Sequence, residues 1–189
     1  MISAILLAAG QSKRMIDENK LTRIFKGIPL IKHSVENILE SNIDELIIVL
    51  GYQKKIIQNI FKKNSKIKFA INENFADGMS TSIKTGLSHL SINSDAFFIC
   101  LGDMPMINKK IYNHLIKSRG DNDIIVPTYK DKQANPVLFS KFMKTKIMSI
   151  TGDFGAKKIL SQNKNKILNI KIDDISITED FNTKDDFNF

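Results

Sequence analysis

Short apolar runs of strand length alternate with segments of helical periodicity along nearly the whole of this 189-residue chain. Such alternation is typical of βα units arranged around a mainly parallel sheet. Residues 2–7 are apolar at nearly every position, as expected for a strand that is covered on both faces. The pattern therefore predicts an α/β protein, in which ligands bind beyond the carboxyl ends of the parallel strands.

The expected strands are residues 2–7, 46–50, 67–71, 96–101, 123–128, 136–139 and, at an edge of the sheet, 167–172. Apolar residues at helical spacing predict helices that include residues 31–39, 56–61, 83–90 and 111–116. A further helix is expected at residues 153–160, and Thr183 is expected to cap a short terminal helix. The stretch between Gly10 and Pro29 is expected to be a long polar loop.

The length fits one domain over residues 1–189, at roughly 100 to 200 residues per domain. Apolar residues make up 42% of the chain, enough for a single large core. No apolar run approaches the roughly 20 residues that span a bilayer, and no basic residue precedes the first apolar run as in a signal peptide. We therefore expect a cytoplasmic chain. Cys100 is the only cysteine, which excludes an internal disulfide and a Cys-based zinc site.

The formal net charge of +8 favours an anionic ligand. The lysines are spread along the chain rather than gathered in one basic arm, and no motif of a nucleic-acid reader is present. The sequence therefore argues against a nucleic-acid partner. A small phosphorylated ligand agrees with the charge.

The common nucleotide and hydrolase motifs are missing. No G-x-G-x-x-G follows the first strand, and no phosphate-binding loop of the P-loop type is present. His33, His89 and His114 lack the H-E-x-x-H spacing of a zinc protease, and residues 78–80 lack the second glycine of a nucleophile elbow. Dinucleotide oxidoreductases, P-loop enzymes and serine hydrolases are therefore disfavoured.

The remaining candidate is the loop at residues 7–15, together with Lys20. Small residues directly after a buried strand let backbone N–H groups approach phosphate oxygens. Lys13, Arg14 and Lys20 add positive charge there. On these residues alone, a solvated basic loop without a ligand is an equally good interpretation.

Residues 7–15 read Leu-Ala-Ala-Gly-x-Ser-x-Arg-Met, with a lysine a few residues later. This resembles the signature loop of the MobA-like nucleotidyltransferases, which attach a nucleotide to molybdopterin, and most of all that of the molybdenum cofactor cytidylyltransferases. The resemblance covers the whole chain in order, through residues 29–31, 72, 78–83, 86–87, 101–105, 135–139, 151–156 and 183–187. Ile16, Gln133 and Ala134 depart from the family pattern, the first in the triphosphate loop and the others on the acceptor side.

The resemblance implies a Rossmann-like three-layer α/β/α fold of the nucleotide-diphospho-sugar transferase type. It also implies an enzyme that transfers CMP from CTP to the phosphate of molybdopterin and releases pyrophosphate. Alternatives are a GTP-using guanylyltransferase, a nucleotidyltransferase for another small phosphorylated acceptor, and a non-catalytic carrier of molybdenum cofactor. The expected partners are CTP or another nucleoside triphosphate, a phosphorylated pterin and a receiving molybdenum-dependent oxidoreductase, with no membrane.

The implied reaction requires no general base, because a phosphate monoester with a second pKa of about 6 is already largely an oxyanion at neutral pH. Positioning and charge neutralisation should therefore dominate catalysis. The resemblance assigns catalytic roles to Arg14, Lys20 and Asp103, with Asp103 as the carboxylate that binds Mg²⁺. Asp180 is either a second metal carboxylate or a surface aspartate.

Two groups of binding residues complete the expected site. The nucleotide is expected to contact Leu7, Ala8, Ala9, Gly10, Ser12, Arg14, Lys20, Asn72, Gly78, Ser82 and Asp103, with Asn72 and Ser82 at the base. The acceptor is expected within residues 130–189, at Asn135, Pro136, Gly152, Asp153 and Gly155.

Overall fold

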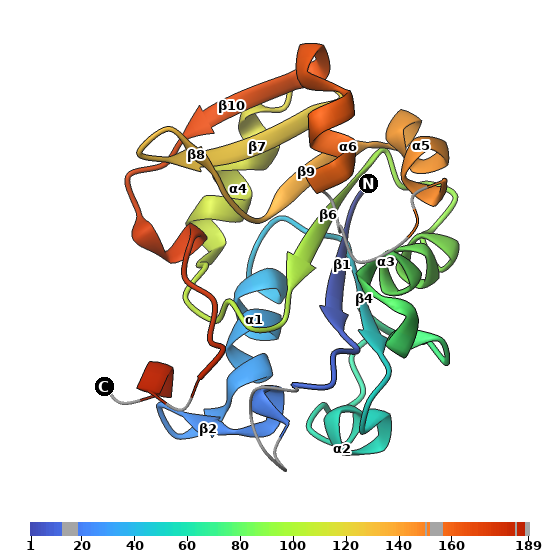
Figure 1. Ribbon diagram of the computed structural model, residues 1–189, viewed down its shortest axis with the longest axis vertical. Helices are drawn as coiled ribbons and strands as arrows, with labels where there is room; N and C mark the ends of the chain where they lie inside the picture. Colours follow the sequence, from blue (N-terminus) through green and yellow to red (C-terminus); the bar gives the residue numbers. More distant parts are fainter. Residues whose placement is uncertain (13–18, 150, 152–156, 184, 188–189) are drawn as a thin grey trace.

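The computed structural model describes residues 1–12, 19–149, 151, 157–183 and 185–187, and these form a sheet flanked by helices (Figure 1). Within this part of the chain eight strands belong to one sheet, in the order β10-β7-β9-β6-β1-β4-β5, with β8 paired to β7. The strands are β1 (Ile2–Ala8), β4 (Glu45–Leu50), β5 (Ile67–Ile71), β6 (Ala96–Leu101), β7 (Ile124–Tyr129), β8 (Lys132–Gln133), β9 (Val137–Ser140) and β10 (Ile167–Lys171).

The sheet is mixed but mostly parallel. Strands β4, β1 and β6 pair in parallel at its centre, β5 pairs in parallel with β4, and β10 pairs in parallel with β7. Strand β9 runs antiparallel to both of its neighbours, β6 and β7. The parallel strands therefore place their carboxyl ends along one edge, where open α/β sheets bind ligands.

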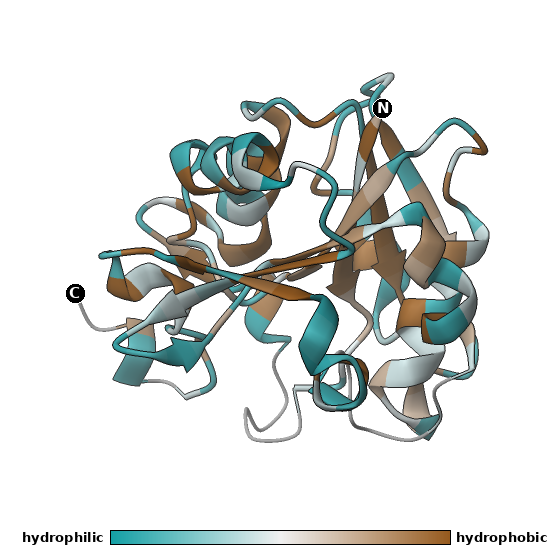
Figure 2. Cartoon of the chain, turned by 90° about the horizontal axis from the view of Figure 1, so that it is seen from above, coloured by the Kyte–Doolittle hydropathy of each residue, from teal (hydrophilic) through white to brown (hydrophobic). Residues whose placement is uncertain are grey.

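Helices cover both faces of the sheet (Figures 1 and 2). The helices are α1 (Leu30–Leu39), α2 (Lys54–Gln58), α3 (Met79–Ser88), α4 (Lys109–Ser118), α5 (Lys144–Met148) and α6 (Lys157–Gln162). Alternate residues of β1 point to opposite faces, so Leu6 joins the core beneath α1 and α4, whereas Ile5 joins the core beneath α3, α5 and α6. This arrangement confirms the three-layer α/β/α fold expected from the sequence.

Gly86 allows α3 to lie directly on the centre of the sheet. A Cβ atom at this position would lie 2.3 Å from Cγ2 of Ile5, closer than any real contact. The glycine therefore sets the depth at which α3 packs on β1, and with it the position of the helix start next to the strand ends.

The expected polar loop between Gly10 and Pro29 contains more structure than predicted. A hairpin of β2 (Ile24–Phe25) and β3 (Ile28–Pro29) lies within it, and its turn residues Lys26 and Gly27 have positive φ angles. Two-residue strands are too short to produce an alternating pattern, so the sequence expectation was wrong here. Helix α5 was also not anticipated.

Two helical segments differ from those expected. Helix α2 ends at Gln58 rather than near residue 61, and the terminal segment forms a 3₁₀ turn at Asp185–Phe187 instead of an α-helix. Helix α6 is described over Lys157–Gln162, and residues 153–156 of the helix expected there lie outside the described residues. No helix in the described part of the chain is long and apolar enough to cross a membrane.

Candidate active site

A cavity of about 330 Å³ lies at the carboxyl ends of β1 and β6. It is lined by Leu7, Ala8, Ala9, Gly10, Ser12, Lys20, Leu21, Met79, Ser82, Leu101, Asp103 and Asn182. We call this the strand-end cavity. Eight of the residues expected to bind the nucleotide are among these twelve, so the structure brings most of the expected site together in one place.

The floor of the strand-end cavity is the chain that leaves β1. Ala8 and Ala9 are buried, whereas Gly10 is exposed and an added Cβ would meet no atom within 4 Å. Ser12 has a φ of 51°, and its hydroxyl accepts a hydrogen bond of 3.2 Å from the backbone N–H of Lys20. This bond ties the two ends of the basic loop together. Lys13 and Arg14 lie outside the described residues.

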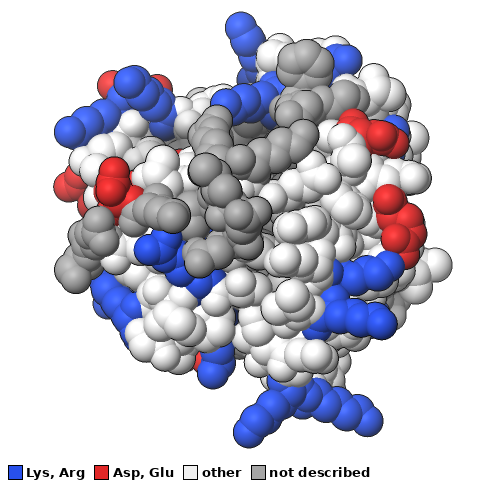
Figure 3. Space-filling model, turned by 60° about the horizontal axis from the view of Figure 1, so that its bottom comes forward, with Lys and Arg blue, Asp and Glu red and all other residues white. Residues whose placement is uncertain are grey.

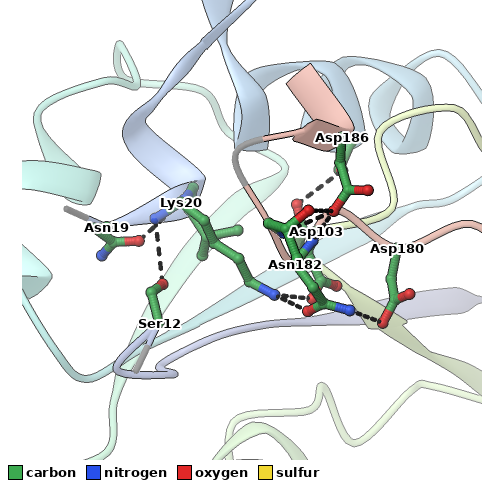
Figure 4. A network of polar contacts seen from close by, with 11 residues as sticks. Ser12, Asn19, Lys20, Asp103, Asp180, Asn182 and Asp186 are labelled. Carbon is green, nitrogen blue, oxygen red and sulfur yellow. Dashed lines mark hydrogen bonds and ion pairs between the residues drawn. The ribbon is translucent and has the colours of Figure 1, made fainter. Parts of the chain in front are cut away.

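Lys20 and Asp103 form an ion pair at the wall of the cavity (Figure 4). Lys20 Nζ lies 2.5 Å from Asp103 Oδ2 and also donates a hydrogen bond of 2.8 Å to Asn182 Oδ1. Each of the two charged side chains is only 17% exposed. The pair joins the loop after β1 to the loop after β6, two segments 83 residues apart.

The C-terminal segment at residues 177–187 holds this pair from the other side. Its backbone N–H at Phe181 donates to the carbonyl of Asp103 at 2.9 Å, and the Asn182 side-chain amide donates to Asp180 Oδ2 at 2.7 Å. The backbone N–H groups of Thr183 and Asn182 both donate to Asp186 Oδ2, and these hydrogen bonds lower the pKa of the Asp186 carboxyl. Hydrogen bonds therefore hold the backbone of the segment on both sides of Asn182, at Phe181 and at Thr183.

An aromatic cluster attaches the C-terminal segment to the β2–β3 hairpin. The ring of Phe25 meets that of Phe181 edge-on, with centroids 4.8 Å apart, and Phe181 meets Phe187 at 5.3 Å. The Arg23 guanidinium lies 4.6 Å from the Phe187 ring centroid. Figure 1 shows the turn Asp185–Phe187, in red, beside β2. The cluster explains how Asn182 reaches a cavity whose other residues come mostly from the first half of the chain.

Asn72 and Ser82, expected together at the base, have different positions. Ser82 lines the strand-end cavity from the first turn of α3, whereas Asn72 is buried behind it. The Asn72 amide donates to the hydroxyls of Ser82 at 3.0 Å and Thr81 at 2.9 Å, so its described contacts orient the start of α3. Gly78 precedes α3 with a φ of 107° and is not among the lining residues.

A second, larger cavity of about 770 Å³ adjoins the first, and Met79 and Leu101 line both. We call it the outer cavity. Its remaining lining residues are Ile99, Gln133, Ala134, Asn135, Val137, Lys157, Leu160, Ser161, Lys164, Ile167, Asn169 and Asp180. Asn135, one of the residues expected to bind the acceptor, therefore lines the outer cavity, and Pro136 is its buried neighbour. Gly152, Asp153 and Gly155 lie outside the described residues.

The lining residues that had not been singled out from the sequence include Asn182, Lys157 and Lys164. Asn182 lies in the segment Asp-Phe-Asn-Thr, which the resemblance touched only at Thr183. Lys157 and Lys164 line the outer cavity, but in the sequence they are two lysines among many. On the face shown in Figure 3 the Lys and Arg side chains stand in separate groups rather than in one stripe.

The residues around Asp103 fit a hard divalent cation. No group of three or more His, Cys, Asp or Glu side chains in the described part of the chain converges as a metal site. However, Asp103 Oδ2 and Asn182 Oδ1 already contact one cationic group, Lys20 Nζ, and carboxylate and amide oxygens are donors that Mg²⁺ and Mn²⁺ accept. Such ions complete their coordination with water and substrate phosphates, so two protein oxygens are enough.

The family of the chain follows from comparison with known proteins. A family model described as the MobA-like NTP transferase domain matches residues 4–167. The chain belongs to this family. It is therefore a nucleotidyltransferase of the MobA-like type, which confirms the class of enzyme expected from the sequence.

Curated relatives of this MobA-like chain differ in nucleotide and in length. The molybdenum cofactor cytidylyltransferase of Escherichia coli is 25% identical over 186 residues, which cover 98% of this chain and 93% of that protein. A probable molybdenum cofactor guanylyltransferase of Methanosarcina acetivorans is 26% identical over 160 residues, 82% of this chain and 70% of that protein. The bifunctional protein GlmU of Geotalea uraniireducens is 24% identical over 162 residues, 85% of this chain but only 34% of that protein.

Solved structures agree with the fold. Rv0371c from Mycobacterium tuberculosis has a TM-score of 0.86 at 19% identity, covering 99% of this chain and 95% of that one. A complex of the same protein with manganese has a TM-score of 0.81 at 18% identity, covering 99% and 96%. A nucleotidyl transferase from Methanothermobacter has a TM-score of 0.85 at 16% identity, covering 100% and 94%. At these identities the likeness concerns the fold.

Proposed function

We propose that this MobA-like enzyme transfers CMP from CTP to the phosphate of molybdopterin and releases pyrophosphate. The observation that carries the proposal is the junction of two cavities beside Asp103. The strand-end cavity has the small residues that let a nucleoside triphosphate approach the backbone, and Lys20, paired with Asp103, lines it. The outer cavity shares Met79 and Leu101 with it and has room for a second substrate. The near full-length similarity to a cytidylyltransferase supports the choice of CTP.

The reaction needs two polyanions to be held in line. Backbone N–H groups at Ala8 to Gly10 and the Ser12 hydroxyl would hold the triphosphate, while Arg14 and Lys20 neutralise its charge. The acceptor phosphate would enter from the outer cavity, where Lys157 and Lys164 attract it. As an oxyanion it attacks the α-phosphorus without a general base, and pyrophosphate leaves.

Asp103 would hold a divalent metal ion, with the Asn182 amide oxygen beside it and Asp180 behind. The ion supplies Lewis-acid polarisation and neutralises charge on the phosphate oxygens when it is bound. The manganese complex of the M. tuberculosis protein supports a divalent metal, and Mg²⁺ is our choice for this chain. Asn135, Pro136, Gly152, Asp153 and Gly155 would form the acceptor side, while Asn72 and Gly78 would support the nucleotide through the start of α3.

A GTP-dependent reaction is the main competing proposal, because a guanylyltransferase is among the relatives. The Ala8-Ala9-Gly10 form of the loop favours CTP, since it resembles the cytidylyl branch. A thermal-shift panel of the four nucleoside triphosphates with Mg²⁺ separates the two, because a ligand at 100 times its dissociation constant stabilises by roughly 2.7 kcal/mol. The largest shift should come from CTP. A larger shift with GTP would refute the cytidine assignment.

Pyrophosphate release tests the transfer itself. With CTP, Mg²⁺ and molybdopterin the protein should release pyrophosphate, whereas a carrier of finished cofactor should release none. If pyrophosphate is released with a different phosphorylated acceptor and not with molybdopterin, the proposed acceptor is wrong but the proposed nucleotidyl transfer is right. The receiving oxidoreductase and the cytoplasmic location stay predictions.

A further inference from the structure

Lys20 occupies the position that a metal ion would take. Its Nζ lies between two oxygen atoms, 2.5 Å from Asp103 Oδ2 and 2.8 Å from Asn182 Oδ1 (Figure 4). These are the two oxygens that suit a divalent cation, and one small cationic group already binds both. An ammonium group and a metal ion cannot both bind these two oxygens, because the two positive charges would then lie only a few ångströms apart and repel each other.

The two oxygens are held independently of Lys20. The backbone of Asp103 is fixed by the hydrogen bond from Phe181, and the Asn182 amide is oriented by its bond to Asp180 Oδ2. The bond from the Asn182 backbone to Asp186 holds the other end of the residue. The site therefore keeps its shape when the cation changes.

Only the side chain of Lys20 needs to move. The backbone N–H of Lys20 donates a hydrogen bond of 3.2 Å to the Ser12 hydroxyl, and Lys20 is the first residue of the 3₁₀ turn Lys20–Thr22. These contacts fix the position of its Cα atom. The flexible four-carbon stem lets the ammonium group swing away from a fixed Cα atom. Because Lys20 also lines the strand-end cavity, a displaced ammonium group stays within reach of a triphosphate.

We infer that the Lys20 ammonium group is a stand-in cation, bound to the oxygens of Asp103 and Asn182 until a divalent metal displaces it. The released ammonium group then meets the triphosphate. The inference rests on the proposed function only in naming a metal–nucleotide complex as the ligand that completes the exchange. Metal alone must expel Lys20 with no anion to receive it, so metal and nucleotide should favour each other's binding.

The test measures Mn²⁺ binding to the full chain without nucleotide, by electron paramagnetic resonance of the free ion. Lys20→Met removes the competing cation and keeps the length of the side chain. It should bind Mn²⁺ more tightly than the parent by about fivefold, in line with the loss of a competing ion pair. Asp103→Asn in the Lys20→Met background should abolish the gain.

Lys54→Met is the matched control, because Lys54 pairs with Glu73 at 2.5 Å and its loss changes the net charge equally. It should alter Mn²⁺ affinity far less than Lys20→Met. Equal gains in the two variants, or a gain that survives Asp103→Asn, would overturn the inference. Neither outcome concerns pyrophosphate release, so the proposed function is judged separately.

A second measurement uses the parent protein and so avoids any folding defect of the variants. Acetylation by acetic anhydride, read by mass spectrometry, should modify Lys20 slowly because its ammonium group is paired and largely buried. Saturating Mn²⁺ should accelerate modification of Lys20 several-fold and leave Lys54 unchanged. An unchanged rate at Lys20 in metal-saturated protein would contradict the displacement.

Discussion

The strand-end cavity and the outer cavity are adjacent but built in different ways. The first, of about 330 Å³, is formed by the ends of buried strands, and its polar groups are fixed by hydrogen bonds to one another. The second, of about 770 Å³, is bordered by the edge strand β10 and helix α6, and its two lysines are exposed. A fixed cavity suits the reacting phosphates, whereas an open one tolerates variation in the acceptor.

This difference assigns separate tasks to the two sides. Preorganised groups stabilise charge in the transition state without having to reorganise, which is the property that accelerates phosphoryl-type transfer. Exposed lysines raise the local concentration of an anion but fix its geometry less well. Changes on the strand-end side should therefore affect kcat, and changes on the outer side should affect KM for the acceptor.

Asp103→Asn should have the largest effect. The substitution keeps the shape of the side chain but removes the charge that binds a hard cation. Turnover should fall by about 100-fold or more, as when a key electrostatic group is lost, with little change in Tm. Because the acceptor needs no base, a higher pH should not restore activity. The measurement is the Mg²⁺ dependence of pyrophosphate release.

The matched control is Asp95→Asn. Asp95 precedes β6 as Asp103 follows it, and it is ion-paired with the N-terminus at 2.8 Å and with Lys141 at 3.4 Å. Its loss should leave turnover near the parent value. If Asp103→Asn reaches the parent's maximal rate with the same Mg²⁺ dependence, the metal role of Asp103 is wrong.

Asn182→Ala should have the next largest effect. It removes the acceptor of the Lys20 hydrogen bond and the donor to Asp180, and a hydrogen bond to a charged group contributes about 1.5 to 3 kcal/mol. Solvent access reduces this, so we expect roughly a tenfold loss in kcat with little change in acceptor KM. A change confined to acceptor KM would mean that Asn182 acts on acceptor binding in the outer cavity rather than on the reacting phosphates.

The same contrast decides how much could be predicted from the sequence. Residues that follow buried strands, such as Gly10 and Asp103, could be placed because apolar runs mark the strands and parallel strands end at one edge. Asn182 could not, since the aromatic cluster of Phe25, Phe181 and Phe187 brings it to the site. Phe25 thereby contacts two rings more than 150 positions away in the chain, and no local pattern encodes such a pairing.

The base-binding expectation shows a different limit. The family resemblance placed Asn72 and Ser82 together at the base, but of the two only Ser82 lines the strand-end cavity, and the Asn72 amide donates a buried hydrogen bond of 3.0 Å to the Ser82 hydroxyl. The direction of a side chain depends on its partners, which spacing along the chain does not give. Lys157 and Lys164 were missed because a lysine-rich sequence hides which lysines share a cavity.

Lys157→Ala and Lys164→Ala should have smaller effects, and these should be confined to the binding of the acceptor in the outer cavity. Each removes one exposed charge from the wall of the outer cavity, so acceptor KM should rise by about three- to tenfold while KM for CTP stays constant. Steady-state kinetics with each substrate varied in turn gives the answer. Lys62→Ala controls for net charge, because Lys62 is exposed and lines neither cavity. Equal changes in both KM values would erase the proposed division of tasks.

Asp186→Asn should have the smallest effect of these substitutions, and its effect on the C-terminal segment should depend on pH. Hydrogen bonds from the backbone N–H groups of Thr183 and Asn182 lower its pKa below the usual 3.8. A lowered carboxyl pKa stabilises the folded segment above about pH 4, and that contribution is lost as the pH falls through the lowered pKa. Asp186→Asn should therefore speed amide hydrogen exchange at Asn182 and Thr183 at neutral pH, and the difference from the parent should vanish once the pH lies below the lowered pKa.

The exposed neighbour Asp185 provides the control, since Asp185→Asn removes the same charge one residue away. It should leave exchange at Asn182 and Thr183 close to the parent at every pH. If the Asp186→Asn difference instead persists at low pH, the ionised carboxylate does not hold the segment. In that case the aromatic cluster and the remaining hydrogen bonds of Phe181 and Asn182 must keep Asn182 against Lys20, and the fixed character of the strand-end cavity would not depend on the charge of Asp186.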